Sequence, residues 1–128
     1  MNQKRSIRRV IGYTLLEIMI VVALIGMFAA LAIPSFIRVR KQSQGRRIVS
    51  DARIIDGAIN AWALQMNKSD GAVVDLATVG TYSKTGSIST NDILGNPYEI
   101  GPIGSNQVRI ATETKQALAG VSIDWGAY

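Results

Sequence analysis

The chain of 128 residues has room for one domain, and its hydrophobic residues, 48% of the total, are concentrated in the first third. It contains neither cysteine nor histidine, which excludes disulfides, the usual zinc sites and catalysis by either side chain. The formal net charge of +5 arises largely at the N-terminus, where Lys4, Arg5, Arg8 and Arg9 lie, so it is mainly a targeting feature.

Residues 1–12 are polar and basic, and a long apolar stretch follows from Tyr13. No charge occurs from Ile18 to Ile37, a length that at about 1.5 Å per residue matches the about 30 Å hydrocarbon core of a bilayer. We expect residues 1–12 to be a leader that is removed and residues 13–37 to form a transmembrane helix. Cleavage at Ala29–Ala32 by signal peptidase is the alternative, but signal sequences have shorter apolar regions of about 7–15 residues.

Beyond Pro34 the apolar pattern becomes periodic. Apolar residues recur at spacings of four and three, which predicts one face of an amphipathic helix over residues 38–66: Ile48, Ala52, Ile55, Ile59, Trp62 and Met66. The whole helix is expected from about Tyr13 to Met66, ending at turn formers and a left-handed Gly71. A basic collar begins the amphipathic part, formed by Arg38, Arg40, Lys41, Arg46 and Arg47. We interpret the collar as solvated; lipid headgroups or acidic protein surfaces are the alternative contacts.

Residues 67–128 form the expected globular part, which is poor in large apolar residues from Leu76 onward and should depend on the helix for its core. Four runs are compatible with strands, and the last two could pair as a hairpin: Val79–Ser83, Tyr98–Ile100, Val108–Thr112 and Val121–Trp125. The expected fold class is α+β. A long N-terminal helix, membrane-spanning in its first half and amphipathic in its second, would pack on a small antiparallel β-sheet.

The boundary of the leader carries a specific motif, Gly12-Tyr13-Thr14-Leu15-Leu16-Glu17, which continues through Gly26 to Pro34. This string closely resembles the processing site of type IV prepilins and of type II secretion pseudopilins, and it implies a pilin-like fold. In that family a membrane-embedded aspartyl peptidase cuts after the glycine and methylates the new amino terminus. The resemblance therefore implies cleavage between Gly12 and Tyr13 and N-methylation of Tyr13, which stands where the family usually has phenylalanine.

Glu17 places a carboxylate in an apolar segment, which is costly in a membrane and seldom kept without a partner. Cleavage would create one, because the amine of Tyr13 lies four residues earlier and a helix N-terminus also favours an anion. The resemblance implies that Glu17 neutralises the amino terminus of a neighbouring subunit during assembly. A juxtamembrane charge that reaches the lipid headgroups is the alternative.

Gly26 and Pro34 are expected to kink or loosen the helix. Pro34 has no N–H to bond the Ala30 carbonyl, and glycine has low helix propensity. Such a weak point would help the helix move from bilayer to filament. The alternative is that both residues only assist packing, as they often do in membrane helices.

The segment Asn91–Tyr98 resembles a Gly-Asn-Pro-Tyr segment of major pseudopilins, and locally it predicts a turn followed by a strand. Major pseudopilins usually carry an aspartate-rich calcium loop near the C-terminus. Here Glu113 and Asp124 are the only acidic residues after Glu99, so we assign no metal and no other cofactor. The disulfide common in type IVa pilins is impossible, which leaves the subfamily open.

No catalytic residues are expected, because the sequence has neither a phosphate-binding loop nor a Ser-His-Asp set. Asp51 and Asp56 are interpreted as solvent-facing helix residues. Trp62, Trp125 and Tyr128 are interpreted as packing residues rather than a ligand platform.

The motif implies a non-enzymatic structural subunit of a type II secretion pseudopilus or type IV pilus-like filament, held in the bacterial inner membrane by one span before assembly. Its C-terminal domain would lie in the periplasm or outside. The implied partners are prepilin peptidase, other copies of the chain, minor pseudopilins, the inner-membrane assembly platform and membrane lipid, with neither a small-molecule substrate nor nucleic acid expected. The alternatives are a singly anchored periplasmic or surface binding domain that does not polymerise and a pseudopilin for DNA uptake.

Overall fold

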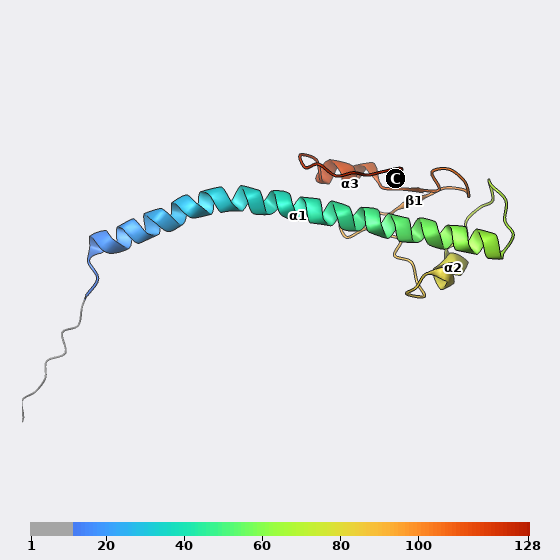
Figure 1. Cartoon of the computed structure of the whole chain (residues 1–128), viewed down its shortest axis with the longest axis horizontal. Coiled ribbons are helices and arrows are strands. Elements are labelled where there is room, and N and C mark those ends of the chain that lie inside the picture. Colours follow the sequence, from blue (N-terminus) through green and yellow to red (C-terminus); the bar gives the residue numbers. More distant parts are fainter. Residues whose placement is uncertain (1–11) are drawn as a thin grey trace, which may run out of the picture. The chain divides into compact units, whose positions relative to one another are not determined.

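The computed structural model describes residues 12–128, so residues 1–11 of the expected leader lie outside the described part. Two units are distinguished, one ending at Phe36 and one comprising Ile37–Tyr128. Helix α1 (Leu15–Gln65) begins in the first unit and continues without a break into the second (Figure 1). The second unit also contains α2 (Leu76–Val79), the 3-10 helix η1 (Gly80–Tyr82), β1 (Glu99–Ile100), β2 (Val108–Arg109) and α3 (Thr112–Ala117).

The C-terminus of α1 is closed by a left-handed asparagine. Asn67 has φ of 49°, and its N–H donates to the Leu64 carbonyl at 3.3 Å. The N–H of Lys68 donates to the Ala63 carbonyl at 2.9 Å, which completes a Schellman cap. The sequence predicted Gly71 for this role. Gly71 does have a positive φ, but in the turn that follows, because asparagine tolerates the left-handed conformation and comes directly after the last helical turn.

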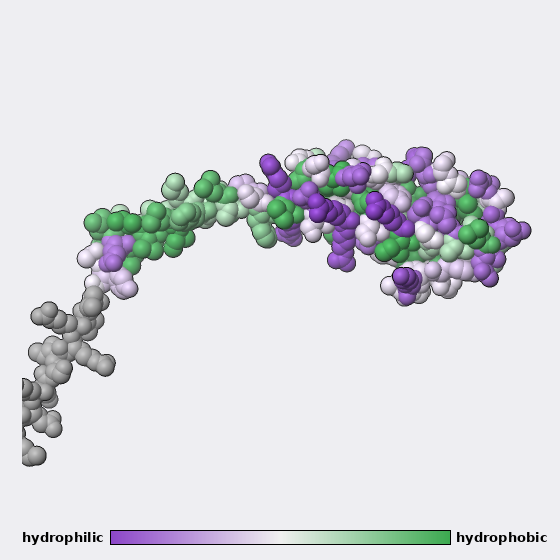
Figure 2. Space-filling view, viewed as in Figure 1, coloured by the Kyte–Doolittle hydropathy of each residue, from purple (hydrophilic) through white to green (hydrophobic). Residues whose placement is uncertain are grey.

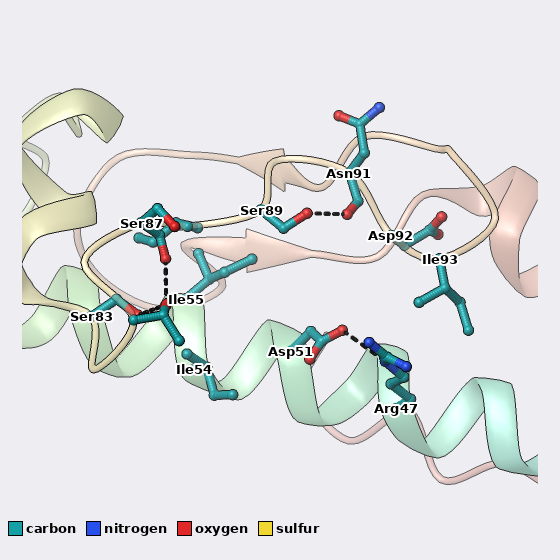
Figure 3. A pocket seen from close by; sticks show the side chains of 12 residues that line it. Arg47, Asp51, Ile54, Ile55, Ser83, Ser87, Ser89, Asn91, Asp92 and Ile93 are labelled. Carbon is teal, nitrogen blue, oxygen red and sulfur yellow. Dashed lines mark hydrogen bonds and ion pairs between the residues drawn. The ribbon is translucent and has the colours of Figure 1, made fainter.

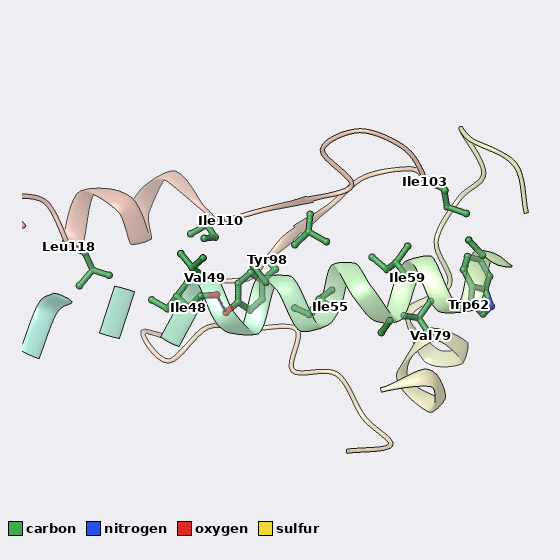
Figure 4. Packing of buried hydrophobic residues seen from close by; sticks show 14 residues of the cluster. Ile48, Val49, Ile55, Ile59, Trp62, Val79, Tyr98, Ile103, Ile110 and Leu118 are labelled. Carbon is green, nitrogen blue, oxygen red and sulfur yellow. Dashed lines mark hydrogen bonds between the residues drawn. The ribbon is translucent and has the colours of Figure 1, made fainter. Parts of the chain in front are cut away.

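The core of the second unit is built on one face of α1 (Figure 4). The predicted apolar face is confirmed from Ile48 to Trp62, and Trp125 and Tyr128 pack against the same cluster. Met66 was expected on this face but is 47% exposed, because α1 ends one residue before it. The remainder of the chain covers the face with Val79, Tyr98, Ile103, Val108, Ile110 and Leu118.

Residues 76–82 are helical, so the predicted strand Val79–Ser83 is wrong. Asp75 is the N-cap of α2: its carboxylate accepts a hydrogen bond from the Ala77 N–H at 3.1 Å and another from the Thr78 hydroxyl. The Thr78 hydroxyl, and then the Ala77 N–H, lower the pKa of Asp75. A local cap therefore outweighs the β-propensity of the valine and tyrosine in this run.

The sheet has two short strands, β1 and β2, which pair antiparallel with Glu99 opposite Arg109 and Ile100 opposite Val108. The predicted strands at Tyr98–Ile100 and Val108–Thr112 are confirmed in place but are shorter. The predicted partner Val121–Trp125 is wrong, since it contains no strand.

The C-terminal segment instead packs on α1. Gly45 is buried there, and a Cβ at this position would lie 2.4 Å from Cδ1 and 2.9 Å from Cγ1 of Ile123. The Gln42 side-chain amide donates to the Ser122 carbonyl at 3.5 Å. A glycine thus lets residues 121–125 approach the helix closely, and side-chain packing takes the place of strand pairing.

A polar cluster fixes the turn that precedes β1. Asp92 is 7% exposed, and its Oδ1 accepts from the N–H groups of Leu94 at 2.8 Å and Asn96 at 3.0 Å. Its Oδ2 accepts from the hydroxyl of Thr114 on α3, and the Asn96 side-chain amide also donates to that hydroxyl at 2.9 Å. The predicted turn is thereby tied to α3 through buried groups that have their hydrogen bonds satisfied.

Candidate functional site

The N-terminal motif lies at the start of α1. Gly12 and Tyr13 precede the helix, Tyr13 is 78% exposed, and a Cβ at Gly12 would meet nothing within 4 Å. The helix begins at Leu15, two residues later than expected. The peptide bond between Gly12 and Tyr13 is therefore accessible and non-helical, as a protease needs when it binds a substrate in extended form.

The start of α1 is set by Thr14. Its hydroxyl oxygen accepts a hydrogen bond from the Glu17 N–H at 3.2 Å, and its carbonyl accepts from the Ile18 N–H at 3.3 Å. Thr14 is thus the N-cap, and the Thr-x-x-Glu spacing is that of a capping box. Glu17 consequently lies in the first helical turn, where the N-terminal end of the helix dipole favours a negative charge.

The segment from Leu15 to Ile37 exposes a largely apolar surface. All large apolar side chains from Leu15 to Ile37 are exposed, and the helix contains an 18-residue window with a mean hydropathy of 2.7 and none of its residues buried. Figure 2 shows this hydrophobic surface along the first unit. Burying one such side chain is worth about 1.5–3 kcal/mol. Length and composition therefore suit this segment to a lipid or helical environment rather than water.

Gly26 and Pro34 both lie inside α1, which is continuous through them. A Cβ at Gly26 would meet nothing within 4 Å, so contacts within the described chain do not require glycine there. Next to Pro34, the Ser35 hydroxyl donates to the Leu31 carbonyl at 3.4 Å. Such a back-bond often accompanies helix bending, and its acceptor is the carbonyl next to the one that proline leaves without its N–H partner.

The basic collar follows the apolar segment on α1. Arg38, Arg40 and Arg46 are exposed, and Arg47 forms an ion pair with Asp51 at 4.0 Å. The Arg47 side chain is 71% exposed, so this pair contributes little stability.

A surface pocket of about 410 Å³ lies beside the helix in the second unit (Figure 3). Arg47, Asp51 and Ile54 line it from α1, and a hydroxyl-rich loop from Ser83 to Ser89 lines the other side. The Ser89 hydroxyl donates to the backbone carbonyl of Asn91 at 2.7 Å. Within residues 12–128, no group of three or more acidic side chains is placed to hold a metal ion.

Two further contacts were not anticipated from the sequence. The Thr14 cap had a detectable signal, the Thr-x-x-Glu spacing before an apolar run. The second contact, between Gln107 and Asp56, had no signal in the local sequence. Asp56 is half-buried rather than solvent-facing, and its Oδ1 accepts from the Gln107 side-chain amide at 2.8 Å. The same amide also donates to the side-chain Oδ1 of Asn60 at 2.9 Å.

Comparison with known proteins finds relatives that are components of pili or secretion systems. The chain is 35% identical over 81 residues to the type IV major fimbrial protein FimA of Dichelobacter nodosus, covering 63% of this chain and 51% of FimA. It is 29% identical over 132 aligned positions to the type II secretion system core protein G of Aeromonas hydrophila, covering 93% and 92%. It is 27% identical over 121 positions to fimbrial protein Q of Moraxella bovis, covering 88% and 76%.

The match to core protein G extends along nearly the whole of both chains, whereas the match to FimA spans about half of that protein's length. No protein-family model and no solved structure matches the chain. The likeness to pilus and secretion-system proteins thus rests on sequence and agrees with the helix and motif described above.

Proposed function

We propose that this chain, a homologue of type IV pilins and of the major pseudopilins of type II secretion systems, is a structural subunit that assembles into a filament. The observation that carries the proposal is the uncovered apolar surface of α1 from Leu15 to Ile37, in which Glu17 is the only charged residue. A lipid bilayer can cover this surface before assembly, and α1 helices of other copies can cover it afterwards. The role is structural and involves no catalytic step.

Processing is the first step of the proposal. Prepilin peptidase cleaves between Gly12 and Tyr13 and methylates the amine of Tyr13. The exposed, non-helical backbone at this bond supports the assignment. Before cleavage, the chain is held in the bacterial inner membrane by one span, with the second unit in the periplasm or outside. The inner-membrane assembly platform, minor pseudopilins and lipid are its further partners.

Glu17 gives the apolar segment its preference for a neighbouring subunit over lipid. Its carboxylate is expensive in hydrocarbon unless it is paired. In the filament, the Tyr13 amine of an adjacent copy supplies the opposite charge, in an environment where ion pairs are weakly screened. Thr14 supports this arrangement because its cap holds Glu17 in the first turn of α1.

The processing step is tested by expressing the chain with and without a prepilin peptidase and determining the N-terminus by mass spectrometry. The expected product begins at Tyr13 and carries one methyl group. The Gly12→Leu variant should remain uncut, because a bulky side chain would obstruct an extended substrate there. An identical mass with and without the peptidase would refute the processing step.

The assembly step is tested with Glu17→Ala and the near-isosteric Glu17→Gln, with Glu113→Gln, the same substitution at an exposed carboxylate on α3, as a matched control. Both Glu17 variants should be cleaved normally, and both should lose filaments in electron micrographs, since neither carries the charge. Glu113→Gln should retain filaments, because its carboxylate is exposed and lies outside the apolar segment. Normal filament yield from Glu17→Gln would contradict the electrostatic role.

A further inference from the structure

The basic collar of α1 has almost no counter-charge of its own. No aspartate or glutamate occurs in the sequence between Glu17 and Asp51. Within residues 12–128, the collar makes one ion pair, between Arg47 and Asp51. The other four cations therefore have no acidic partner in the described part of the chain.

Three of these cations are available to an external anion. Arg38 and Arg40 are exposed and make no hydrogen bond or ion pair among the described residues. Lys41 is half-buried, and its Nζ donates to the Ala119 carbonyl at 3.5 Å. That bond uses one of the three donors of the ammonium group, so the other two remain free to bind an anion.

The C-terminal segment packed on α1 does not neutralise the collar. Its carboxylate, Asp124, lines a surface pocket of about 420 Å³ together with Arg46 and Arg53. The Asp124 Oδ1 accepts from the Gly126 N–H at 3.0 Å, and within the described chain Asp124 forms no ion pair with either arginine. The collar thus keeps a net positive charge on the folded second unit.

The first three cations of the collar lie at the depth of a lipid headgroup layer. They belong to the second unit, as does Ile37, which ends the uncharged stretch of the sequence. In the continuous helix α1, Arg38, Arg40 and Lys41 lie about 1.5, 4.5 and 6 Å beyond Ile37 along the helix axis. The headgroup region on each side of a bilayer is about 5–7.5 Å thick. All three charges can therefore reach it when residues up to Ile37 occupy the hydrocarbon core.

The same three cations surround the helix. At about 100° per residue, they lie at about 0°, 200° and 300° around α1. A bilayer surrounds a helix on every side at one depth, whereas a protein surface or a DNA duplex contacts one side. Ile37 and Val39 alternate with the arginines and are 51% and 63% exposed, which suits an interface that takes apolar side chains and charged ends together. The arrangement favours lipid headgroups as the partner.

We propose that the basic collar binds the phosphate groups of anionic phospholipids in the leaflet that faces the second unit. The inference rests on the membrane-spanning stage of the proposed function and adds the class of lipid to it. Guanidinium groups match phosphate oxygens in bidentate geometry. An anionic lipid is preferred to a zwitterionic one because the collar is left with net positive charge.

The test compares lipid binding by the unsubstituted full chain with binding by Arg38→Gln/Arg40→Gln. This double variant removes two exposed cations and no contact within the described chain, so it should fold normally. The matched control, Lys68→Gln/Lys84→Gln, makes the same change in net charge at exposed positions outside the collar. Native mass spectrometry of the chains in neutral detergent measures binding of phosphatidylglycerol, which is anionic, against phosphatidylcholine, which is zwitterionic. The basic residues of the leader are common to all three chains, so differences between the chains report the collar.

The unsubstituted chain and the control should prefer phosphatidylglycerol to the same extent. Each basic residue near an anionic surface contributes about fivefold in affinity, so the preference of Arg38→Gln/Arg40→Gln should be about 25-fold smaller. Equal preferences in the double variant and the control would overturn the proposal. Displacement of phosphatidylglycerol by an equal concentration of free glycerol 3-phosphate would also overturn it, since the site would then bind a phosphate without needing a membrane.

A second measurement uses a bilayer. The chain has no cysteine, so Val39→Cys gives a single site for a fluorophore within the collar. In vesicles, energy transfer to acyl-labelled phosphatidylglycerol should exceed transfer to acyl-labelled phosphatidylcholine, and the excess should disappear when Arg38 and Arg40 are replaced. Equal transfer to both lipids in the otherwise unsubstituted chain would contradict the proposal.

Two outcomes separate this inference from its alternatives. Duplex DNA that binds the unsubstituted chain but not Arg38→Gln/Arg40→Gln, without any preference for phosphatidylglycerol, would assign the collar to nucleic acid and overturn the lipid proposal. A full chain that does not float with vesicles would refute the membrane span, and this inference would fail with it. Loss of the lipid preference alone leaves the proposed filament role intact, because filament yield is measured separately.

Discussion

Replacing Gly45 with alanine tests how closely the C-terminal segment packs on α1. The added methyl group would lie 2.4 Å from Cδ1, 2.9 Å from Cγ1 and 3.1 Å from Cγ2 of Ile123, so the isoleucine must move as a whole. Such overpacking costs about 1–3 kcal/mol. The higher helix propensity of alanine offsets only about 0.5–1 kcal/mol of this cost. We expect a net loss of about 1 kcal/mol in the free energy of unfolding.

Gly57→Ala is the matched control, because Gly57 lies in the same helix and faces open space. It has the propensity gain without the clash and should stabilise the solubilised chain by about 0.5–1 kcal/mol. The difference between the two variants therefore isolates the contact with Ile123. In a domain of this size, 1 kcal/mol corresponds to a shift of about 4–8 °C in melting temperature.

The assay is thermal unfolding of the full chain in detergent, followed by the fluorescence of Trp62 in the core and Trp125 packed against it. Ile123→Ala in the Gly45→Ala background should restore part of the loss, and the double-mutant cycle gives the coupling energy. If Gly45→Ala and Gly57→Ala stabilise the chain equally, the close approach of residues 121–125 to α1 is refuted.

Three further variants probe other contacts. Thr14→Ala removes the N-cap of α1 and should cost about 0.5–2 kcal/mol locally, seen as faster hydrogen exchange of the Glu17 amide. Gln107→Met deletes the amide that bridges Asp56 to the β1–β2 loop and should cost about 1–3 kcal/mol in chemical unfolding. Burial raises the pKa of Tyr98 above its ordinary 10.0, so its contribution to stability is present below pH 10 and declines as the pH rises further. Tyr98→Phe should therefore flatten the fall in melting temperature above that pH.

Each of these expectations has a contrary result. Unchanged amide exchange at Glu17 would show that Thr14 does not hold the first turn. A Gln107→Met chain as stable as the original would mean that water replaces the bridge at no cost. If the melting temperature of Tyr98→Phe falls as steeply above pH 10 as that of the original chain, groups other than Tyr98 cause the loss of stability at high pH.

The sequence alone determined the features that depend on residues close together in the chain. The apolar run, the Gly12–Glu17 motif and the spacing of four and three from Ile48 to Trp62 predict a long helix with an anchoring half and a core-forming half. The structure contains this helix, beginning at Leu15 and continuing through Gly26 and Pro34. The spacing of apolar residues predicts such a helix well because each helical turn places a residue on the same face.

Tertiary structure decided what depends on segments distant in the chain. Val121–Trp125 has an alternating pattern suited to a strand, but Gly45 leaves room for Ile123 against α1, and β2 pairs with β1 instead. The bridge between Gln107 and Asp56 likewise joins residues with no local relationship. Strand propensity indicates only that a residue fits an extended, half-buried segment, and it does not specify the segment's partner. Which surface it meets is set by the packing of the remaining chain on one face of α1.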